Sequence, residues 1–491
     1  MILETTLLNA DDRLSTIKQA MDSGAHLSLI TSIDGKQILT VLSWAQTGKV
    51  KCFETPVSGQ SYPSLTRLIP QAHWFERTVW DMFGLFPEGH PRLKHTHLHE
   101  TYGCMPYPLA EGSAPPSDRA YEFLEVEGDG VYEIPVGPIH AGIIEPGHFR
   151  FSCYGEVIVN LEIRLGYVHR GVEKRLTEIP WAKTRFVAEA TASDMAAANA
   201  LANATALESF FDVEIPRRAL LLRTAAAEVE RVAMHICDLG GLATDVGFLG
   251  IASSMSRLRG IALGMSDLLS GNRFLRGFIC PGGVTRSVEK ESIDEIRKAI
   301  IRLKEELNPV VELYLDNQVA VDRMDGIGRI SRKLACDFGL VGVAARGCGL
   351  PNDCRKYSSY ATFPNRDLPI AVEDSGDILG RAKVRIAEIA TSLDLLDLCL
   401  QEVADTTAVS RVQLPSQLPA GRSSLAIVES HRGELIHLVT TDDAGLINRY
   451  CIKDPSVNNW TGVAIAVRSH VVADFPLCNK SFSLSYSGHD L

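Results

Sequence analysis

Alternating apolar and polar positions mark the first part of the chain. Residues 26–33 and 36–45 alternate with a period of two, which is typical of strands with one buried face. The Asp34-Gly35 pair between these two runs is a turn signal. The predicted elements are a helix over 11–24 and strands over 26–33, 36–45 and 49–57. This pattern indicates a small α/β unit.

A denser apolar segment, residues 65–93, follows with a helical period. The apolar positions that share one helical face are Trp74, Phe75, Val79, Met82 and Phe83. Pro87, Gly89 and Pro91 are expected to end this helix, because proline cannot continue it. Trp74, Phe75 and Trp80 are predicted to be core and interface anchors and not part of a catalytic site.

The second part of the chain predicts a hairpin followed by long helices. Residues 149–154 and 156–163 alternate on either side of a turn at Gly155. Long helical patterns then cover residues 182–211, 217–240, 294–321, 329–341 and 378–403. Strand patterns return at 433–443 and 445–452, so a small β element is expected to pack on a helical body.

The composition changes between residues 100 and 130, where Gly, Pro, Ser and acidic residues gather. Such a stretch, with GSAPPSD at 112–118, is typical of a linker or an extended crossing arm. The sequence therefore predicts an N-terminal domain over 1–99, a linker over 100–130 and a larger domain over 131–491. The expected fold class is α+β, with an α/β domain ahead of a mainly helical one.

Composition and charge narrow the functional classes. The chain has 491 residues, 45% hydrophobic and 22% charged, and a formal net charge of -11. This charge argues against nucleic acid as a partner, because phosphate binding needs a basic surface. No stretch approaches the roughly 20 apolar residues that span a bilayer. The first residues are acidic where a signal peptide would be basic, so a cytoplasmic location is expected.

Sequence motifs for common cofactors are missing. The eleven cysteines include no C-x-x-C pair, and scattered cysteines are mostly small buried residues. Neither G-x-G-x-x-G nor G-x-x-x-x-G-K-[ST] occurs, so nucleotide binding is not expected.

Several long segments resemble one family in its own order along the chain. Residues 72–93, AHWFERTVWDMFGLFPEGHPRL, are similar to the signature of the 30-kDa-type subunit of complex I. Residues 137–151 with 164–174 resemble the opening hairpin of the large subunit shared by complex I and [NiFe] hydrogenases. The segments 228–248, 345–357 and 474–491 extend the match over nearly the whole chain. The fused order is similar to the large subunit of hydrogenase-4 and formate hydrogenlyase, in the superfamily of complex I and group 4 [NiFe] hydrogenases.

The resemblance implies a role inside a membrane complex. It implies a complex I 30-kDa-like domain before a 49-kDa-like domain. It also implies a peripheral oxidoreductase subunit at the cytoplasmic face of the cell membrane, related to NADH dehydrogenase. The expected partners are a small iron-sulfur subunit with a [4Fe-4S] cluster and membrane subunits that move ions. Quinone is the expected electron acceptor.

The nickel ligands of the family are missing. Family hydrogenases hold nickel and iron with two C-x-x-C pairs, because soft thiolates suit this metal pair. The register puts Ala192 and Met195 at the first pair, and Phe475 with Cys478 at the second. [NiFe] chemistry is therefore not expected, and no cofactor is expected to be bound by this chain.

Candidate site residues follow from the same register. His140 and His148 lie in the hairpin loop, where the family uses a histidine for the quinone headgroup, and Ser193 stands where the family has its quinone tyrosine. The alternative is that both histidines only hydrogen-bond their loop. Asp194 and Arg346 are predicted to join His148 as catalytic candidates. Asp194 could bind a proton or a polar substrate, or it could pair with Arg346 or another base.

For two further residues the family resemblance implies a role in a proton path. His169 and Glu173 are expected to relay protons towards the membrane partners, or else to belong to an internal salt-bridge network. Lys480 and His489 could line the same cavity as Asp194.

Three functional hypotheses remain at this point. The first is a quinone-reducing subunit, the second a docking platform without catalysis, and the third a hydrogenase with unusual ligands.

Overall fold

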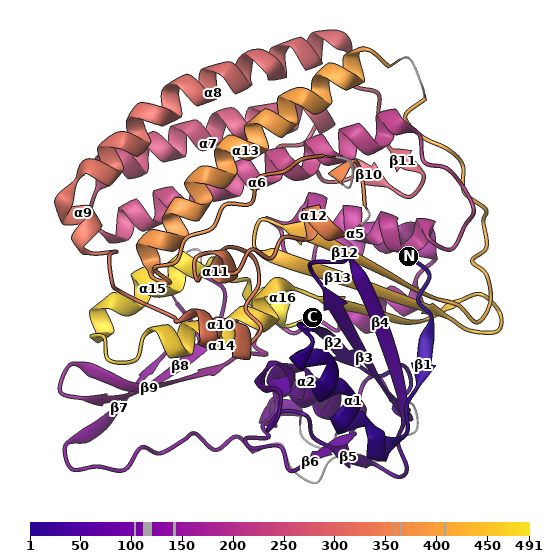
Figure 1. The fold of residues 1–491 in the computed structure, drawn as a ribbon, viewed down its shortest axis with the longest axis vertical. Helices are drawn as coiled ribbons and strands as arrows, with labels where there is room; N and C mark the ends of the chain where they lie inside the picture. Colours follow the sequence, from indigo (N-terminus) through magenta and orange to yellow (C-terminus); the bar gives the residue numbers. More distant parts are fainter. Residues whose placement is uncertain (103–104, 111–119, 141–143, 359, 364–365, 407–408) are drawn as a thin grey trace.

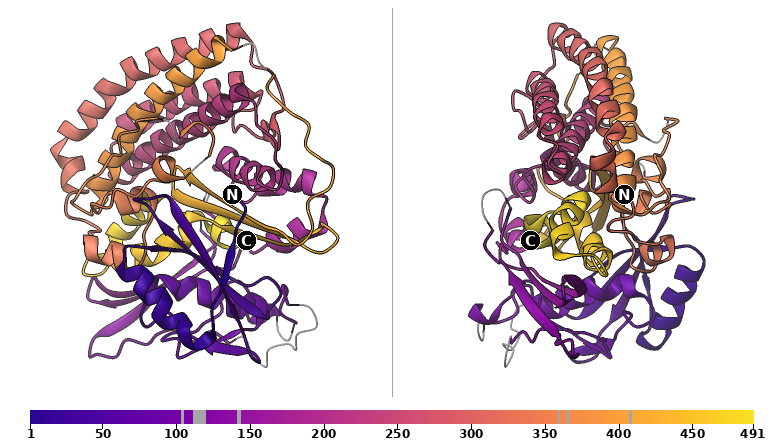
Figure 2. Two further views of the ribbon diagram at one scale, coloured as in Figure 1. Left: turned by 45° about the vertical axis from the view of Figure 1, so that its right-hand side comes forward. Right: turned by 90° about the vertical axis from the view of Figure 1, so that its left-hand side faces the viewer.

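The computed structural model describes residues 1–102, 105–110, 120–140, 144–358, 360–363, 366–406 and 409–491 (Figures 1 and 2). An N-terminal unit, indigo in Figure 1, lies below a body of long helices, and a sheet from the C-terminal part runs between them. The predicted linker motif GSAPPSD falls on residues 112–118, outside the described residues.

The N-terminal unit is a four-stranded sheet with two helices packed against it. Its elements are β1 (Thr5–Leu7), α1 (Ala10–Asp22), β2 (His26–Thr31), β3 (Gln37–Trp44), β4 (Lys49–Pro56) and α2 (His73–Phe83). The strand order is β1-β4-β3-β2, with β1 parallel to β4 and the other pairs antiparallel. The predicted helix, the three predicted strands and the turn at Gly35, where φ is 82°, are confirmed.

Helix α2 buries the predicted apolar face, but it ends earlier than predicted. Trp74 and Phe75 are buried, whereas Trp80 is half-buried and stacks on His95. Gly84, with φ of 75°, closes the helix in the left-handed conformation that glycine adopts without strain. The prediction that Pro87, Gly89 and Pro91 end the helix was therefore wrong. Pro87 lies instead in strand β6 (Phe86–Glu88), which pairs with β5 (Ser61–Pro63).

A three-stranded antiparallel sheet opens the second part of the chain. Its strands are β7 (Val131–Val136), β8 (His148–Tyr154) and β9 (Val157–Arg164). The β8–β9 hairpin with its turn at Gly155 was predicted, whereas β7 was not. Strand β9 leads through a short connection into α3 (Val172–Glu178), which contains Glu173.

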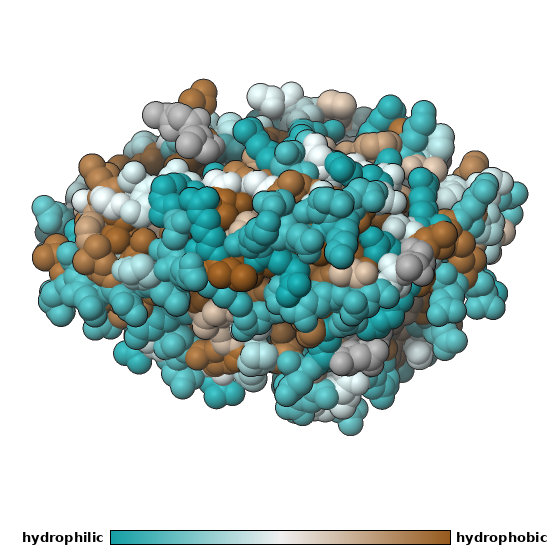
Figure 3. Space-filling view, turned by 90° about the horizontal axis from the view of Figure 1, so that it is seen from above, coloured by the Kyte–Doolittle hydropathy of each residue, from teal (hydrophilic) through white to brown (hydrophobic). Residues whose placement is uncertain are grey.

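The helical body rests on four long helices. They are α6 (Arg217–Asp245), α7 (Leu249–Ser270), α8 (Lys290–Asp316) and α13 (Ile378–Ala404). Helix α6 packs on α7 and α13, and α8 packs on the same two, so the four enclose one core. From above, polar residues dominate this part of the surface and apolar residues are scattered among them (Figure 3). No helix in the described part of the chain is long and apolar enough to cross a membrane.

Shorter elements complete this part of the chain. They are β10 (Ile279–Cys280), β11 (Gly283–Val284), α9 (Gln318–Asp322), α10 (Arg332–Asp337), α11 (Gly342–Arg346), α12 (Cys354–Tyr357), α14 (Pro455–Ala466), α15 (Phe475–Phe482) and α16 (Tyr486–His489). The helix predicted over 329–341 is only the short α10.

The helix predicted over 182–211 is interrupted. It forms α4 (Thr184–Ala188) and α5 (Ala196–Glu208), and residues 189–195 between them are not helical. Asp194 therefore lies in the break and not within an alanine-rich helix, as the sequence had indicated.

A C-terminal sheet is shared by two hydrophobic cores. Its antiparallel strands are β12 (Ser423–Ser430), β13 (Gly433–Thr441) and β14 (Ile447–Lys453). On β12, Leu425 and Ile427 join the core of the N-terminal unit, whereas Ala426 and Val428 join the core of the helical body. Strand β13 alternates in the same way. The sheet is therefore covered on both faces, which explains why its strands are apolar almost throughout.

Glu434 on β13 fixes a polar contact inside this shared interface. Its carboxylate accepts from Lys453 Nζ at 2.8 Å and lies 3.7 Å from the ring of His26 on β2. Burial alone would raise the pKa of Glu434, but Lys453 and His26 lower it to about 2. The buried carboxylate is therefore held in its charged form.

We expect Glu434→Gln to destabilise the protein at neutral pH by about 3 kcal/mol, the equivalent of a pKa depressed from 4.5 to about 2. Because the folded-state pKa of Glu434 is depressed, its contribution to the free energy of unfolding is fully present above pH 4.5 and is lost as the pH falls towards 2. Wild type and variant should therefore converge in that window, as measured by urea unfolding at several pH values.

Glu178→Gln is the matched control, because Glu178 forms a surface pair with Arg175 and its side chain is 48% exposed. The control should unfold almost as the wild type does. A Glu434→Gln variant with wild-type stability at neutral pH would contradict the assignment.

Candidate functional site

The break at residues 189–195 forms the centre of the candidate site. Ala192 and Met195 are buried, Ser193 is exposed, and the side chain of Asp194 is 38% exposed. An alanine has no ligand atom, and the methionine has only a neutral thioether in place of a thiolate. This segment therefore does not fit the thiolate-bound [NiFe] group that the resemblance would place here.

Asp194 is paired with Arg432, at the turn between β12 and β13. Nη1 and Nη2 of Arg432 donate to the two carboxylate oxygens of Asp194 at 2.9 and 2.6 Å. Burial would raise the pKa of Asp194, but the Arg432 guanidinium and the nearby ring of His431 hold it well below its usual value. The sequence had left the partner open between Arg346 and another base, and the structure gives Arg432.

Glu230 on α6 is the second carboxyl group of this site. Its two oxygens accept from Ala197 N at 2.7 Å and Ala198 N at 3.1 Å, at the first turn of α5. Burial raises the pKa of Glu230 to about 8, although both N–H groups oppose the shift. At neutral pH the site therefore holds one charged carboxylate, Asp194, and one carboxyl group that keeps its proton.

The cavity between these groups is small. Ser193, Asp194, Glu230, Phe274 and Leu275 are among the residues that line it, and its volume is about 10 Å³. A volume of this size is about what one water molecule needs, so the cavity has no room for an organic ring.

The C-terminal tail meets the break farther along than the sequence register suggested. Arg432 Nε donates to Ser483 O, and Arg170 Nη2 donates to both Thr191 O and Ser487 O. The tail residues bound beside the break are therefore Ser483 and Ser487.

The residues expected at the second cysteine pair make other contacts. Phe475 packs on Phe149 and Phe151, with ring centroids 4.9 Å away in both cases. Cys478 lies beside Gly328 and near Arg381. The structure thus gives no contact that brings this pair to Ala192 and Met195 among the described residues.

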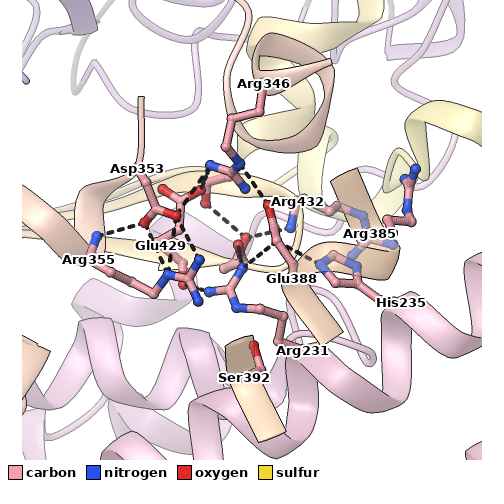
Figure 4. A network of polar contacts seen from close by, with 12 residues as sticks. Arg231, His235, Arg346, Asp353, Arg355, Arg385, Glu388, Ser392, Glu429 and Arg432 are labelled. Atoms are coloured by element: carbon pink, nitrogen blue, oxygen red, sulfur yellow. Dashed lines mark hydrogen bonds and ion pairs between the residues drawn. The ribbon is translucent and has the colours of Figure 1, made fainter. Parts of the chain in front are cut away.

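Arg346 belongs to a sealed ionic network (Figure 4). Its Nε donates to Glu388 and its Nη1 donates to Glu429, each at 2.7 Å, and the side chain is fully buried. The network also contains Glu228, Arg231, His235, Asp353, Arg355 and Ser392. These contacts favour a structural role for Arg346, which faces carboxylates of the core and not the pair at Asp194.

The two loop histidines hydrogen-bond their own loop. His140 Nε2 lies 2.9 Å from Gly147 O, and His148 Nδ1 lies 3.3 Å from Gly137 O. Burial lowers the pKa of His148, which favours the neutral ring. Glu145 of the same loop accepts from Ser487 N at 2.9 Å, so the loop is connected to the tail beside Asp194.

Glu173 lies in a buried ion pair. Its carboxylate accepts from Arg449 Nη2 at 2.8 Å and from Ile452 N at 2.9 Å, which ties α3 to β14. His169 makes a different contact, because its ring lies 5.6 Å from that of His97. For Glu173 the geometry fits the salt-bridge alternative. Lys480 pairs with Asp245 at 2.6 Å.

Arg432 and Glu230 were not predicted, although each has a weak signal in the sequence. Arg432 is in the S-H-R-G turn between two apolar strand runs, and Glu230 interrupts the apolar pattern of α6. Their meeting with Asp194 and with α5 depends on contacts between distant residues, 238 positions apart for Arg432 and Asp194.

Both parts of the chain match families of complex I subunits. Residues 8–113 match the family described as respiratory-chain NADH dehydrogenase, 30 Kd subunit. Residues 245–420 match the family described as respiratory-chain NADH dehydrogenase, 49 Kd subunit.

Several curated proteins are similar to most of this chain. The chain is 30% identical over 447 residues to formate hydrogenlyase subunit 5 of Escherichia coli (strain K12), covering 89% of this chain and 78% of that protein. It is 33% identical over 351 residues to the carbon monoxide-induced hydrogenase of Rhodospirillum rubrum, covering 71% and 96%. It is 27% identical to the C/D subunit of the NADH-quinone oxidoreductase of Phocaeicola vulgatus, covering 76% of each.

A solved structure has the same fold. A chain of the membrane-bound sulfane sulfur reductase, an archaeal respiratory membrane complex, superposes with a TM-score of 0.69 at 24% identity, over 74% of this chain and 99% of that one. A 30-kDa-type unit followed by a 49-kDa-type unit defines the class: fused subunits of the complex I and hydrogenase superfamily. The chain belongs to the family of formate hydrogenlyase subunit 5.

The position of Arg432 depends on Gly342, which has φ of +63° and lies against the β12–β13 turn. A Cβ there would lie 1.9 Å from Arg432 O. We expect Gly342→Ala to lower the free energy of unfolding by about 4 kcal/mol, because backbone strain and a clash with main chain add together. Chemical unfolding of the purified chain measures this.

Gly247→Ala is the control, since Gly247 has φ of +80° and nothing lies within 4 Å of the place that a Cβ would take. It should cost only about 1 kcal/mol, from the left-handed conformation alone. Equal effects of the two substitutions would show that the close approach at Arg432 is unimportant.

Proposed function

We propose that the chain is the peripheral large subunit of a membrane-bound, ion-translocating oxidoreductase, and that it reduces a quinone-type acceptor beside Asp194. The electrons come from a [4Fe-4S] cluster in a partner iron-sulfur subunit. The names of relatives, such as NADH-quinone oxidoreductase, support this class of reaction and the membrane partners. The observation that carries the proposal is the pairing of a charged group, Asp194–Arg432, with a carboxyl group that keeps its proton, Glu230.

The chemistry needs two electrons and two protons for each quinone reduced to hydroquinone. Electrons arrive one at a time from the cluster. Glu230, with a pKa of about 8, holds one proton at neutral pH and can release it to one reduced quinone oxygen. Water at the exposed face supplies the second proton to the other oxygen. Arg432 keeps Asp194 ionised, so its carboxylate can accept a hydrogen bond from a hydroxyl group of the hydroquinone that forms.

The acceptor has to lie on the surface of this chain. The cavity of about 10 Å³ is too small for a quinone ring, whereas Ser193 is exposed and Asp194 is 38% exposed. In this proposal the partner subunit supplies the opposite wall. The loop of His140 and His148 borders the same face through the Glu145–Ser487 contact.

The remaining candidates have supporting roles in this proposal. Arg346 fixes the ionic core behind the site, and Glu173 and His169 lie on the path from the hairpin to the C-terminal sheet. No step of the proposed reaction uses nickel, because Ala192 and Met195 do not provide thiolates.

A second candidate function is a docking platform without catalysis. The small cavity at Asp194 favours it, because a filled site leaves little room for a substrate. In that case the Asp194–Arg432 pair would only hold the β12–β13 turn against the break.

The test uses the intact complex, with its metals and its quinone-dependent oxidation of a reduced iron-sulfur donor. We expect iron without nickel, and a turnover that declines above pH 8 as Glu230 loses its proton. Glu230→Gln should lower kcat by about 100-fold and remove this alkaline limb. Asp194→Asn should lower turnover by at least about 10-fold.

Asp397→Asn is the matched control, because Asp397 pairs with Arg297 between α8 and α13, away from the site. It should keep wild-type turnover and pH dependence. Absence of quinone activity in a complete complex would favour the platform, and nickel at one per chain would overturn both hypotheses.

A further inference from the structure

Three histidines and one aspartate from distant parts of the chain meet beside strand β14. His97 comes from the N-terminal unit, His169 follows β9, and His489 and Asp490 belong to the C-terminal tail. The rings of His169 and His489 each lie 5.6 Å from the ring of His97. One ligand atom from each of His97, His489 and Asp490 lies within 4.8 Å of the other two, and all three residues are buried.

Two nitrogens in this cluster lack a hydrogen-bond partner within the described part of the chain. They are Nδ1 of His97, whose residue is 6% exposed, and Nδ1 of His169. The other nitrogen of His97 lies 3.2 Å from Thr78 Oγ1. A buried ring nitrogen without a hydrogen-bond partner is unfavourable, so its presence here points to a ligand.

The donor set suits a transition-metal ion. Imidazole and carboxylate together are the ligands of many Zn²⁺ sites, with bonds of about 2.0–2.2 Å. His489 Nδ1 is hydrogen-bonded to Asp490 Oδ1 at 2.9 Å. Two ligands of a tetrahedral ion with such bonds lie about 3.4 Å apart, so a shift of about 0.5 Å lets both atoms bind one ion.

The surroundings hold the ligands in place. Asp490 Oδ2 accepts from Gly166 N at 2.7 Å and from Val168 N at 3.3 Å, and hydrogen bonds of this kind orient a ligating carboxylate. Trp74 packs edge-on against His489 at 5.0 Å. An adjoining cavity of about 50 Å³, lined by His97, Glu173 and His489, has room for a water ligand.

We propose that His97, His489 and Asp490 bind one divalent transition-metal ion, with Zn²⁺ as the representative ion and His169 within reach as a fourth ligand. The ion would join the N-terminal unit to the C-terminal tail of the same chain. This site is separate from Asp194 and does not depend on the proposed electron transfer.

The test titrates the full-length chain, first freed of metal by a chelator, with Zn²⁺ in a calorimeter, and counts bound metal by mass spectrometry. We expect one Zn²⁺ per chain. His97→Asn and His489→Asn should each weaken binding by at least about 100-fold, since each removes a direct ligand. His90→Asn is the control, because His90 stacks on His73 outside the cluster and should leave the affinity unchanged.

X-ray absorption of the Zn²⁺-loaded wild type keeps the proposal testable if a variant fails to fold. A first shell of nitrogen and oxygen, with outer scattering from at least two imidazoles, supports the site. A sulfur shell would instead point to one of the cysteines. No bound Zn²⁺, a sulfur shell, or full binding in folded His97→Asn and His489→Asn would each overturn the proposal.

Discussion

The buried ionic network around Arg346 is the constraint on which the rest of the structure depends. Arg346 joins α11 to Glu388 on α13 and to Glu429 on β12, and none of these side chains reaches solvent. Removing one partner from such a network leaves an uncompensated charge in a medium of low polarity, so its members must be present together. The long helices and the C-terminal sheet are thereby held in one relative position.

The candidate site is placed by this network. Arg231 on α6 donates to the carbonyl oxygens of Glu429 and Ser430 at 2.8 and 2.9 Å, immediately before the turn that carries Arg432. The turn then presents Arg432 to Asp194. Buried charges that no substrate can reach thus fix the positions of Arg432 and Asp194 at the surface. The residues that stabilise the site are therefore different from those that would take part in its chemistry.

Local patterns predicted the regular elements well, because each depends on the spacing of apolar residues along a short segment. The strands on either side of Gly35 and the long helix through Val229 are examples. The break at 189–195 was not predicted, since the alanine-rich residues 196–206 after it extended the helical pattern across the weak helix formers Thr191, Ser193 and Asp194. Arg170, which binds Ala190 O and Thr191 O, and Glu230, which caps α5, impose the break from a distance.

Contacts between residues that are distant in the sequence also limit how much of the candidate site could be predicted. The sequence pointed to Asp194 as unusual, because a lone carboxylate in an apolar run must find a partner. It could not choose Arg432, because the choice is made by the packing of a β-turn against a helical break. The family resemblance gave the class and the missing cysteines, whereas the contacts of the tail, at Ser483 and Ser487, came only from the folded chain.

The sheet β12–β14, with one face in each hydrophobic core, makes the two halves of the chain dependent on each other. If a gene split separated the N-terminal unit from the remainder, Leu425 and Ile427 would be left on a bare apolar surface. Two such polypeptides would have to associate during or soon after synthesis to avoid aggregation. Fusion into one chain guarantees equal numbers of both halves and raises their effective concentration, so the covalent link promotes their association.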